Sequence, residues 1–239
     1  LPGTPETGLD ERLSMQAEDR VPGSGVLHDL GAGLALSWLD LLTLMVTVSD
    51  NTATNLVIGR LGLPDLQAWL AEEWPQTRLV GRLQLPPDQQ SEAQRRGERN
   101  STTAAQAADL LGRLYRGELL NAAHTALALN ILGRQQYRDL LARHLPRDAF
   151  GEALYQSLSK SGELRGVHHD AGLLLLPRPL SVALLSVGGL LFSGLTLLGR
   201  YSPEMPYSRG LPEITWWSLG ATGFILLILL LLGTGREKS

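Results

Sequence analysis

Apolar residues recur every three to four positions through the first two thirds of the chain, the spacing of helices that bury one face. This spacing predicts a helix over residues 38–48, with Ser37 as its N-cap. Another helix is predicted from residue 53 to Gly59 or Gly62, and Pro64 suits the first turn of a helix that continues to residue 74. Further helices are predicted from Thr102 or Thr103 to about Gly117, from Asn121 to about residue 132, and around residues 138–145.

Other stretches depart from the helical spacing. Residues 1–35 are rich in glycine and proline, and residues 75–100 hold three prolines and many polar residues. The second stretch predicts a long surface loop, and such loops are usually functional or disordered. After residue 154, short apolar runs between glycine and proline turns predict β-strands. A helical block over residues 20–150 followed by strands over 154–187 predicts an α+β fold with an antiparallel sheet, not alternating βαβ units.

The last part of the chain is the most apolar. Residues 214–233 form a run of 20 residues without a charge, which Trp216 and Trp217 open and Arg236 and Lys238 follow. These features predict a transmembrane helix at 214–233, with a buried core helix as the alternative. An uncharged run at 180–198 predicts either more strand or a first transmembrane helix. We therefore expect a folded domain over residues 1–187 and an apolar C-terminal region over residues 188–239.

Composition narrows the possible functions. Of the 239 residues 44% are hydrophobic, which excludes wholesale disorder, and the net charge of −3 argues against a nucleic-acid partner. The chain has no cysteine, so disulfides, thiol catalysis and Cys-ligated metals are excluded. Lys160 and Lys238 are the only lysines, which limits where lysine-dependent chemistry can occur.

Two short polar motifs carry candidate chemistry. Ser49-Asp50-Asn51 lies between two predicted helices, where each of these residue types also serves as an N-cap. Lys160-Ser161-Gly162 lies in a predicted strand that precedes a turn. These motifs, in this order and with the segments at 21–30, 39–62, 97–120 and 160–172, resemble class A β-lactamases and their serine-hydrolase relatives over about residues 9–187.

The resemblance implies a β-lactamase-like fold and a serine hydrolase that acts on β-lactams, or on related cell-wall peptides, through an acyl-serine. It implies that Lys160 and Ser161 bind the substrate carboxylate and that Gly162 lets the substrate lie against the strand. The backbone N–H of Glu163 would stabilise the oxyanion of the tetrahedral intermediate. No cofactor and no metal is implied.

The resemblance also assigns roles within the first motif. Ser49 would act catalytically by relaying a proton to the leaving nitrogen, and Asn51 would bind the acylamide side chain of the substrate. Asp50 is expected to brace the turn and not to touch substrate.

The family nucleophile is missing. It is the serine of an S-x-x-K motif about sixty residues before the SDN motif, which corresponds to about ten residues before Leu1. We therefore expect an N-terminally truncated domain without the nucleophile helix and the first strands. Ser157 precedes Lys160 by three residues, but such residues point to opposite faces of a strand, so Ser157 is not expected to be the nucleophile.

The predicted loop also departs from the family. Pro87 stands at the position of the family's deacylating glutamate, and Asn100 stands at the position of the aspartate that closes the family's loop. Asp88 and Glu92 are the nearby acids that could substitute after a shift of the loop. The missing glutamate favours a slow enzyme, a D,D-peptidase-like relative, or a non-catalytic, membrane-tethered penicillin-recognising protein.

The turn after the second motif holds two further candidates. Adjacent histidines such as His168 and His169 point to opposite faces of a strand and no further ligand is placed, so no metal site is predicted. Arg165 could add positive charge near the substrate carboxylate. Because β-lactams and cell-wall peptides are met outside the cytoplasm, we expect the domain to be membrane-anchored and extracytoplasmic, in the periplasm or at the cell exterior.

Overall fold

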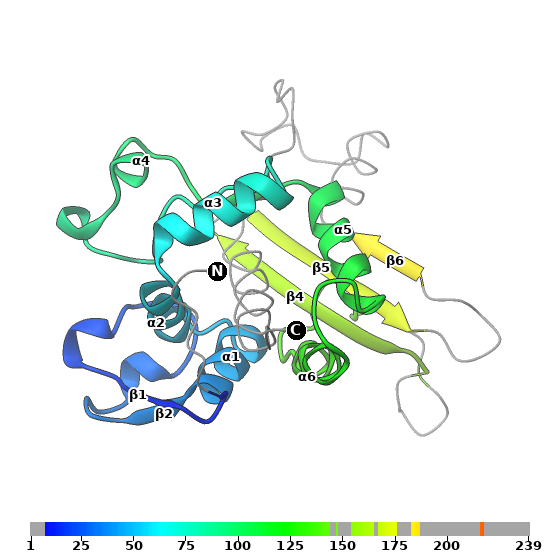
Figure 1. The fold of residues 1–239 in the computed structure, drawn as a ribbon, viewed down its shortest axis with the longest axis horizontal. Helices are drawn as coiled ribbons and strands as arrows, with labels where there is room; N and C mark the ends of the chain where they lie inside the picture. The colour runs from blue at the N-terminus through cyan, green and yellow to red at the C-terminus, as the bar shows by residue number, and fades with distance from the viewer. Residues whose placement is uncertain are drawn as a thin grey trace, which may run out of the picture.

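The structure, a computed structural model, describes residues 8–143, 147, 154–163 and 167–175, and the backbone alone of 164, 183–186 and 216–217. It combines a block of helices with an antiparallel sheet (Figure 1). The longer helices are α1 (Trp38–Thr47), α2 (Asn51–Leu61), α3 (Leu63–Glu73), α5 (Ala104–Tyr115) and α6 (Ala122–Gly133), and α4 (Glu92–Arg95) is a single turn. The short 3-10 segments are η1 (Ala17–Asp19), η2 (Leu27–Asp29) and η3 (Pro87–Gln89).

The main sheet has the strand order β4-β5-β6, with each neighbouring pair antiparallel. Its strands are β4 (Gln156–Leu164), β5 (Val167–Leu175) and β6 (Ala183–Ser186). Helix α6 packs on β4, α5 packs on β5 and β6, and α1 contacts both α2 and α6 (Figure 1). The α+β class is therefore confirmed, and the strand alternative for the run at 180–198 is confirmed for residues 183–186.

Polar caps begin the helices where the sequence predicts them. The Ser37 hydroxyl accepts a hydrogen bond from Asp40 N, and Thr103 and Asn121 cap α5 and α6 in the same way. Helix α2 begins at Asn51, two residues before the predicted start, because the Asp50 side chain caps it. It ends at Leu61, and its C-cap Gly62 has a φ of 84°, in the left-handed region that favours glycine.

The predicted helix around 138–145 is wrong for residues 138–143, which form bends and turns. Side chains take the place of helical carbonyls there: Leu141 N donates to Asp170 Oδ2 at 3.2 Å and Tyr137 N donates to Gln135 Oε1 at 3.0 Å. The glycine-rich N-terminal stretch contains two strands that the sequence does not predict, β1 (Arg12–Ser14) and β2 (Ala35–Ser37).

The predicted transmembrane helix at 214–233 needs a correction at its start. Trp216 and Trp217 form strand β7, which pairs antiparallel with β3 (Ser101–Thr102), so backbone pairing with another segment replaces helical bonding at these two residues. Residues 214–215 and 218–233 lie outside the described residues, as does the rest of the predicted region 188–239. Among the helices that the structure describes, none combines the length and apolar character needed to cross a membrane.

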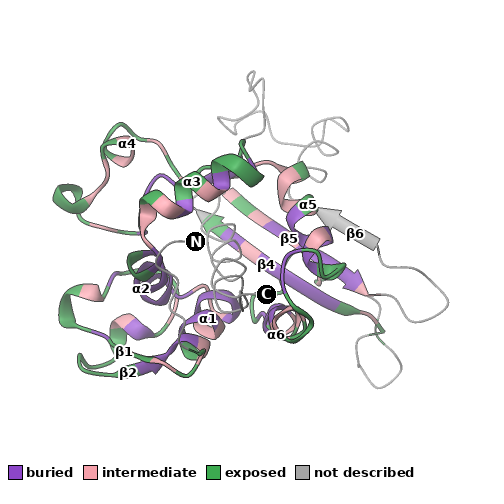
Figure 2. Ribbon diagram, in the orientation of Figure 1, coloured by how far each residue is buried: buried purple, intermediate pink, exposed green. Residues whose placement is uncertain are grey.

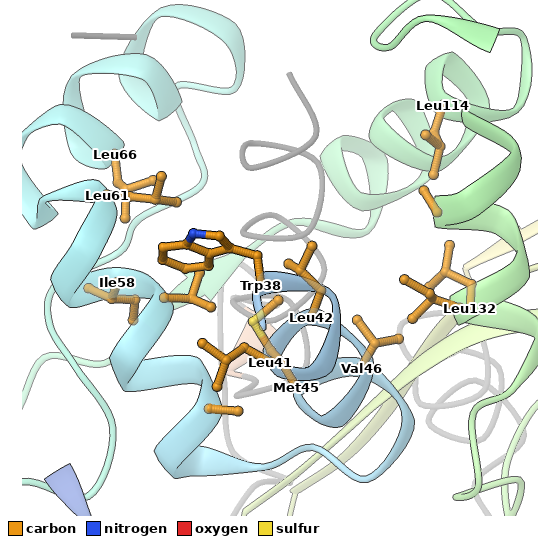
Figure 3. Packing of buried hydrophobic residues seen from close by; sticks show 14 of the residues in the cluster. Trp38, Leu41, Leu42, Met45, Val46, Ile58, Leu61, Leu66, Leu114 and Leu132 are labelled. Atoms are coloured by element: carbon orange, nitrogen blue, oxygen red, sulfur yellow. The ribbon is translucent and has the colours of Figure 1, made fainter. Parts of the chain in front are cut away.

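One hydrophobic core joins the helices to the sheet. Trp38, Leu41 and Met45 of α1 lie at its centre, between Ile58 of α2 and Leu132 of α6 (Figure 3). Leu158 of β4 and Leu173 of β5 belong to the same cluster. Figure 2 shows that β4 and β5 are buried over their middle, whereas α4 and its flanking loops are largely exposed. The core thus holds the α1–α2 connection against the edge of β4.

Candidate functional site

The two polar motifs meet in space. The Lys160 ammonium, on β4, donates hydrogen bonds to the Ser49 hydroxyl and, at 2.6 Å, to the carbonyl of Ser161. Ser49 lies in the connection between α1 and α2 and has a φ of 53°, a left-handed conformation that is uncommon outside glycine. Backbone strain of this kind concentrates at functional sites. The contact joins residues that are 111 positions apart in the chain.

Asp50 is fully buried and holds the connection in place. One of its oxygens accepts hydrogen bonds from Val26 N at 2.7 Å and Leu27 N at 2.9 Å, and the other accepts from Ala53 N at 2.9 Å. A carboxylate that receives three backbone N–H groups is well satisfied without a ligand. Asp50 therefore braces the turn and the facing 24–27 segment, as predicted.

Asn51 makes hydrogen bonds through its backbone N–H and its Nδ2, but not through its Oδ1. Its backbone N–H donates to Ser24 O at 3.0 Å, and its Nδ2 donates to Pro22 O at 3.0 Å. Its Oδ1 is buried and has no hydrogen-bond partner. A buried acceptor of this kind is costly unless a ligand or another donor satisfies it.

A cavity of about 350 Å³ collects these groups. Its walls come from five parts of the chain: the segment at Ser24, the α1–α2 connection with the start of α2, β4, the start of β5, and the segment after α6. The lining residues are Ser24, Ser49, Asn51, Tyr137, Asp139, Leu140, Ser161, Gly162, Glu163, His168 and His169. The structure thus places five of the six predicted site residues on one cavity, and the sixth, Lys160, in contact with one of them.

Burial is the main influence on the pKa values of Lys160 and Asp170. Lys160 is only 5% exposed, and this desolvation lowers the pKa of its ammonium to about 7, although the charge of Asp170 acts in the opposite direction. Burial raises the pKa of Asp170 to about 6, against the hydrogen bond from Leu141 N and the charge of Lys160. Burial therefore brings the pKa values of both Lys160 and Asp170 toward neutrality.

Two cavity residues, Glu163 and His168, also contact each other. Glu163 and His168 face each other across β4 and β5, with 3.2 Å between Oε1 and Nδ1. The neighbouring His169 is partly buried, and this burial, followed by the charge of His168, lowers its pKa to about 4. Arg165, the other candidate of this turn, lies outside the described residues.

The alternative serine and the loop acids lie away from this cavity. Ser157 does not contact Lys160, because strand alternation places the two on opposite faces of β4. Pro87, Asp88 and Glu92 do not line the cavity. Asn100 braces the loop through its side chain, which accepts from Val80 N at 2.8 Å.

Sequence reasoning missed several cavity residues. Tyr137, Asp139 and Leu140 follow α6, and no motif or spacing marks them. Ser24 follows the Pro22-Gly23 turn, the only signal that could have pointed to this segment. The apolar spacing predicts a helix over the segment after α6, and such a pattern gives no sign of a contribution to a cavity.

The α+β fold, with two polar motifs that meet at a cavity, is that of β-lactamase-like serine hydrolases. The profile of the Beta-lactamase enzyme family matches residues 5–189, and the chain belongs to this family. No relative among curated proteins matches the chain.

Solved structures give the same result. A β-lactamase from Sphaerobacter thermophilus DSM 20745 is 29% identical with a TM-score of 0.62, over 83% of this chain and 76% of that one. PBP-A is 27% identical with a TM-score of 0.57, over 72% of this chain and 59% of that one. An ancestral class A β-lactamase is 25% identical with a TM-score of 0.58, over 73% of this chain and 64% of that one. The chain therefore spans only part of the length of these relatives.

Proposed function

We propose that this chain recognises β-lactams and related cell-wall peptides in the cavity between the α1–α2 connection and β4, as a serine hydrolase of the β-lactamase type. The observation that carries the proposal is the contact of Lys160 with Ser49 at a cavity that Asn51, Ser161 and Gly162 also line. Each of these groups has a task in acyl transfer to or from a carboxylate-bearing amide.

Lys160 and Ser161 are the proposed carboxylate site. An ammonium has three donors, and two of those of Lys160 already go to Ser49 and to the Ser161 carbonyl. The third is left for the substrate carboxylate, and the Ser161 hydroxyl is a second donor on the same wall. Gly162 keeps this wall free of a side chain, so that the substrate can lie along β4 and reach the N–H of Glu163.

Ser49 and Asn51 act on the amide itself. The Ser49 hydroxyl accepts a hydrogen bond from Lys160 and can therefore direct its own proton toward the leaving nitrogen as the C–N bond breaks. Asn51 offers its amide at the same wall for the acylamide group of the substrate. Ser49 is the proposed catalytic residue, and Asn51, Lys160, Ser161, Gly162 and Glu163 are the proposed substrate-binding residues.

The nucleophile is not among these residues. Ser157 lies on the opposite face of β4 from Lys160, and Gly235 occupies the position three before Lys238. We therefore expect this chain to bind penicillin without forming an acyl-enzyme.

A second candidate function is penicillin recognition with slow or no turnover. It is favoured by the loop, where Pro87 stands at the glutamate position and neither Asp88 nor Glu92 lines the cavity. A solved structure of a PBP-A variant is an acyl-enzyme complex with penicillin G. A penicillin-recognising protein without efficient turnover would bind the same ligands in the same cavity. The two candidate functions therefore differ only in turnover.

Titration of the chain with penicillin G, by calorimetry, tests the proposal. We expect saturable binding that Lys160→Ala weakens roughly ten- to a hundredfold, because one charge-assisted contact is lost. Undiminished binding by Lys160→Ala would remove the carboxylate site. A fluorescent penicillin on a denaturing gel tests the acyl step separately, and a stoichiometric covalent adduct would show that a serine of this chain is a nucleophile.

We also propose that the domain works outside the cytoplasm, because its proposed substrates are met there. The proposal rests on substrate chemistry alone.

A further inference from the structure

The carbonyl groups at the end of α1 take their hydrogen bonds from the segment after α6, with which α1 is in contact (Figure 1). The last carbonyls of an α-helix have no donor within the helix and need one from elsewhere. Gln135 Nε2 donates to Val46 O at 2.8 Å. The backbone N–H of Gln136 donates to Thr47 O at 3.0 Å. These two bonds hold the end of α1 just before Ser49, which lines the cavity.

Gln135 also shapes the segment to which it belongs. Its Oε1 accepts from Tyr137 N at 3.0 Å, and its own carbonyl accepts from Arg138 Nε at 2.8 Å. The residue is only 2% exposed, and leaving a buried amide unpaired is costly. One end of this amide thus bonds α1, while the other bonds the turn that leads into the cavity residues Tyr137, Asp139 and Leu140.

We propose that Gln135 is a positioning residue of the cavity, whose amide fixes the wall after α6 relative to the wall that carries Ser49. Gln135 does not line the cavity, so it acts through the two segments that it joins. The effect on a ligand rests on the proposed function, because a penicillin would have to fit between these walls. Small shifts matter at such a site, since a misplacement of about 1 Å can cost about a hundredfold in rate.

Asn55 provides a matched control elsewhere in the fold. Its side chain is also a buried amide, whose Nδ2 donates to Leu83 O at 2.8 Å and whose Oδ1 accepts from Leu83 N at 2.7 Å. The two amides therefore make the same kinds of bond to the backbone, but neither Asn55 nor Leu83 lines the cavity. Gln135→Met and Asn55→Leu each remove such a pair of bonds and keep a side chain of similar size. We expect similar losses of stability from the two substitutions.

Calorimetric titration of the full chain with penicillin G compares the two variants under conditions where both are folded. We expect Gln135→Met to weaken binding at least about tenfold, whereas Asn55→Leu should stay within about twofold of the wild type. Arg138→Lys is a milder second variant, because it keeps the charge but cannot repeat both guanidinium bonds, to the carbonyls of Gln135 and Gly133. It should weaken binding several-fold, and it decides the question if Gln135→Met does not fold.

Hydrogen exchange followed by mass spectrometry tests the bridge between the walls without a ligand. In Gln135→Met, backbone N–H groups should exchange faster over residues 46–51 and over 136–141, because both segments lose a bond that restrains them. In Asn55→Leu, faster exchange should instead be confined to residues near Leu83.

Three results would overturn the proposal. The first is faster exchange in only one of the two segments, and the second is the same exchange pattern in Gln135→Met and Asn55→Leu. The third is equal penicillin affinity of the wild type, Gln135→Met and Arg138→Lys. If the wild type itself binds no penicillin, the proposed function fails, and hydrogen exchange alone decides whether Gln135 joins the two walls.

Discussion

At the scale of single residues, the substrate-binding role proposed for Lys160 comes with an energetic cost. Its ammonium is buried, and burial disfavours the charged form. The contacts with Ser49 and the Ser161 carbonyl, and the charge of Asp170, offset part of this cost. A site that holds a charge in this way is poised to bind an anionic group, because a substrate carboxylate supplies the missing opposite charge.

Lys160 should make stability depend on pH. Its folded-state pKa of about 7 lies below the ordinary value of 10.5, so the unfolded chain holds a proton that the folded chain has lost between these values. The free energy of unfolding should therefore rise with pH over this window, by about 1 to 4 kcal/mol. In Lys160→Met this rise should disappear. Urea denaturation at a series of pH values measures the free energy of unfolding of the wild type and of Lys160→Met. An equal rise in the two proteins would contradict the lowered pKa of Lys160.

Asp170 should tune the protonation of Lys160. Its carboxylate favours the ammonium, so Asp170→Asn should lower the Lys160 pKa further. In the wild type, penicillin binding should weaken as the pH rises through about 7, where Lys160 loses its proton. In Asp170→Asn the midpoint of this loss should lie at a lower pH. Glu163→Gln is the matched control, because it removes the same charge from a side chain that is 74% exposed. An unshifted midpoint in Asp170→Asn, or equal shifts in both variants, would contradict a specific role.

At the scale of elements, the connection between α1 and α2 owes its shape to capping. Ser37 begins α1 by a capping box with Asp40, while Asp50 begins α2 and also holds Val26 and Leu27. The second cap thus ties the helix to a segment that flanks the cavity. Glycine at position 25 is required here, because a Cβ at this residue would lie 2.2 Å from Asp50 Oδ2.

The two caps should differ in their contribution to stability. Ser37→Ala should lower the free energy of unfolding by about 1 kcal/mol, the usual cost of a lost N-cap. Asp50→Ala should cost roughly 3 kcal/mol or more, since it leaves two further N–H groups without their acceptor. Urea denaturation compares the two variants directly. Equal losses would show that the bonds to Val26 and Leu27 contribute little.

At the scale of the whole molecule, one core spans the helices and the sheet. Leu158 of β4 packs in the cluster that also contains Trp38, and it is only 2% exposed. Leu158→Ala should cost about 2–5 kcal/mol. Far-UV circular dichroism and tryptophan fluorescence should shift together, because a continuous core unfolds cooperatively. Separate transitions for the two signals would contradict a single core.

The location of the domain is testable with reporter fusions. We expect a reporter active only in the cytoplasm to give no signal when fused after Gly199 in a bacterial host. A reporter active only outside should give signal at the same position. The reverse pattern would place the domain inside the cytoplasm and contradict the proposed location.

Local patterns alone determined much of this protein. Apolar spacing and caps such as Ser37, Thr103 and Asn121 identify the main helices, because both signals act within a few residues. The motifs at Ser49 and Lys160 indicated the family for a related reason, since short segments carry the required residue types.

Only the tertiary structure decided the rest. The bends at 138–143 depend on Asp170, a residue on another element, and the pairing of Trp216–Trp217 depends on β3. The pKa values of Lys160 and Asp170 depend on burial, which no local pattern records. Each of these features depends on contacts between residues far apart in the sequence. Such contacts form only when the chain folds, so no local pattern predicts them.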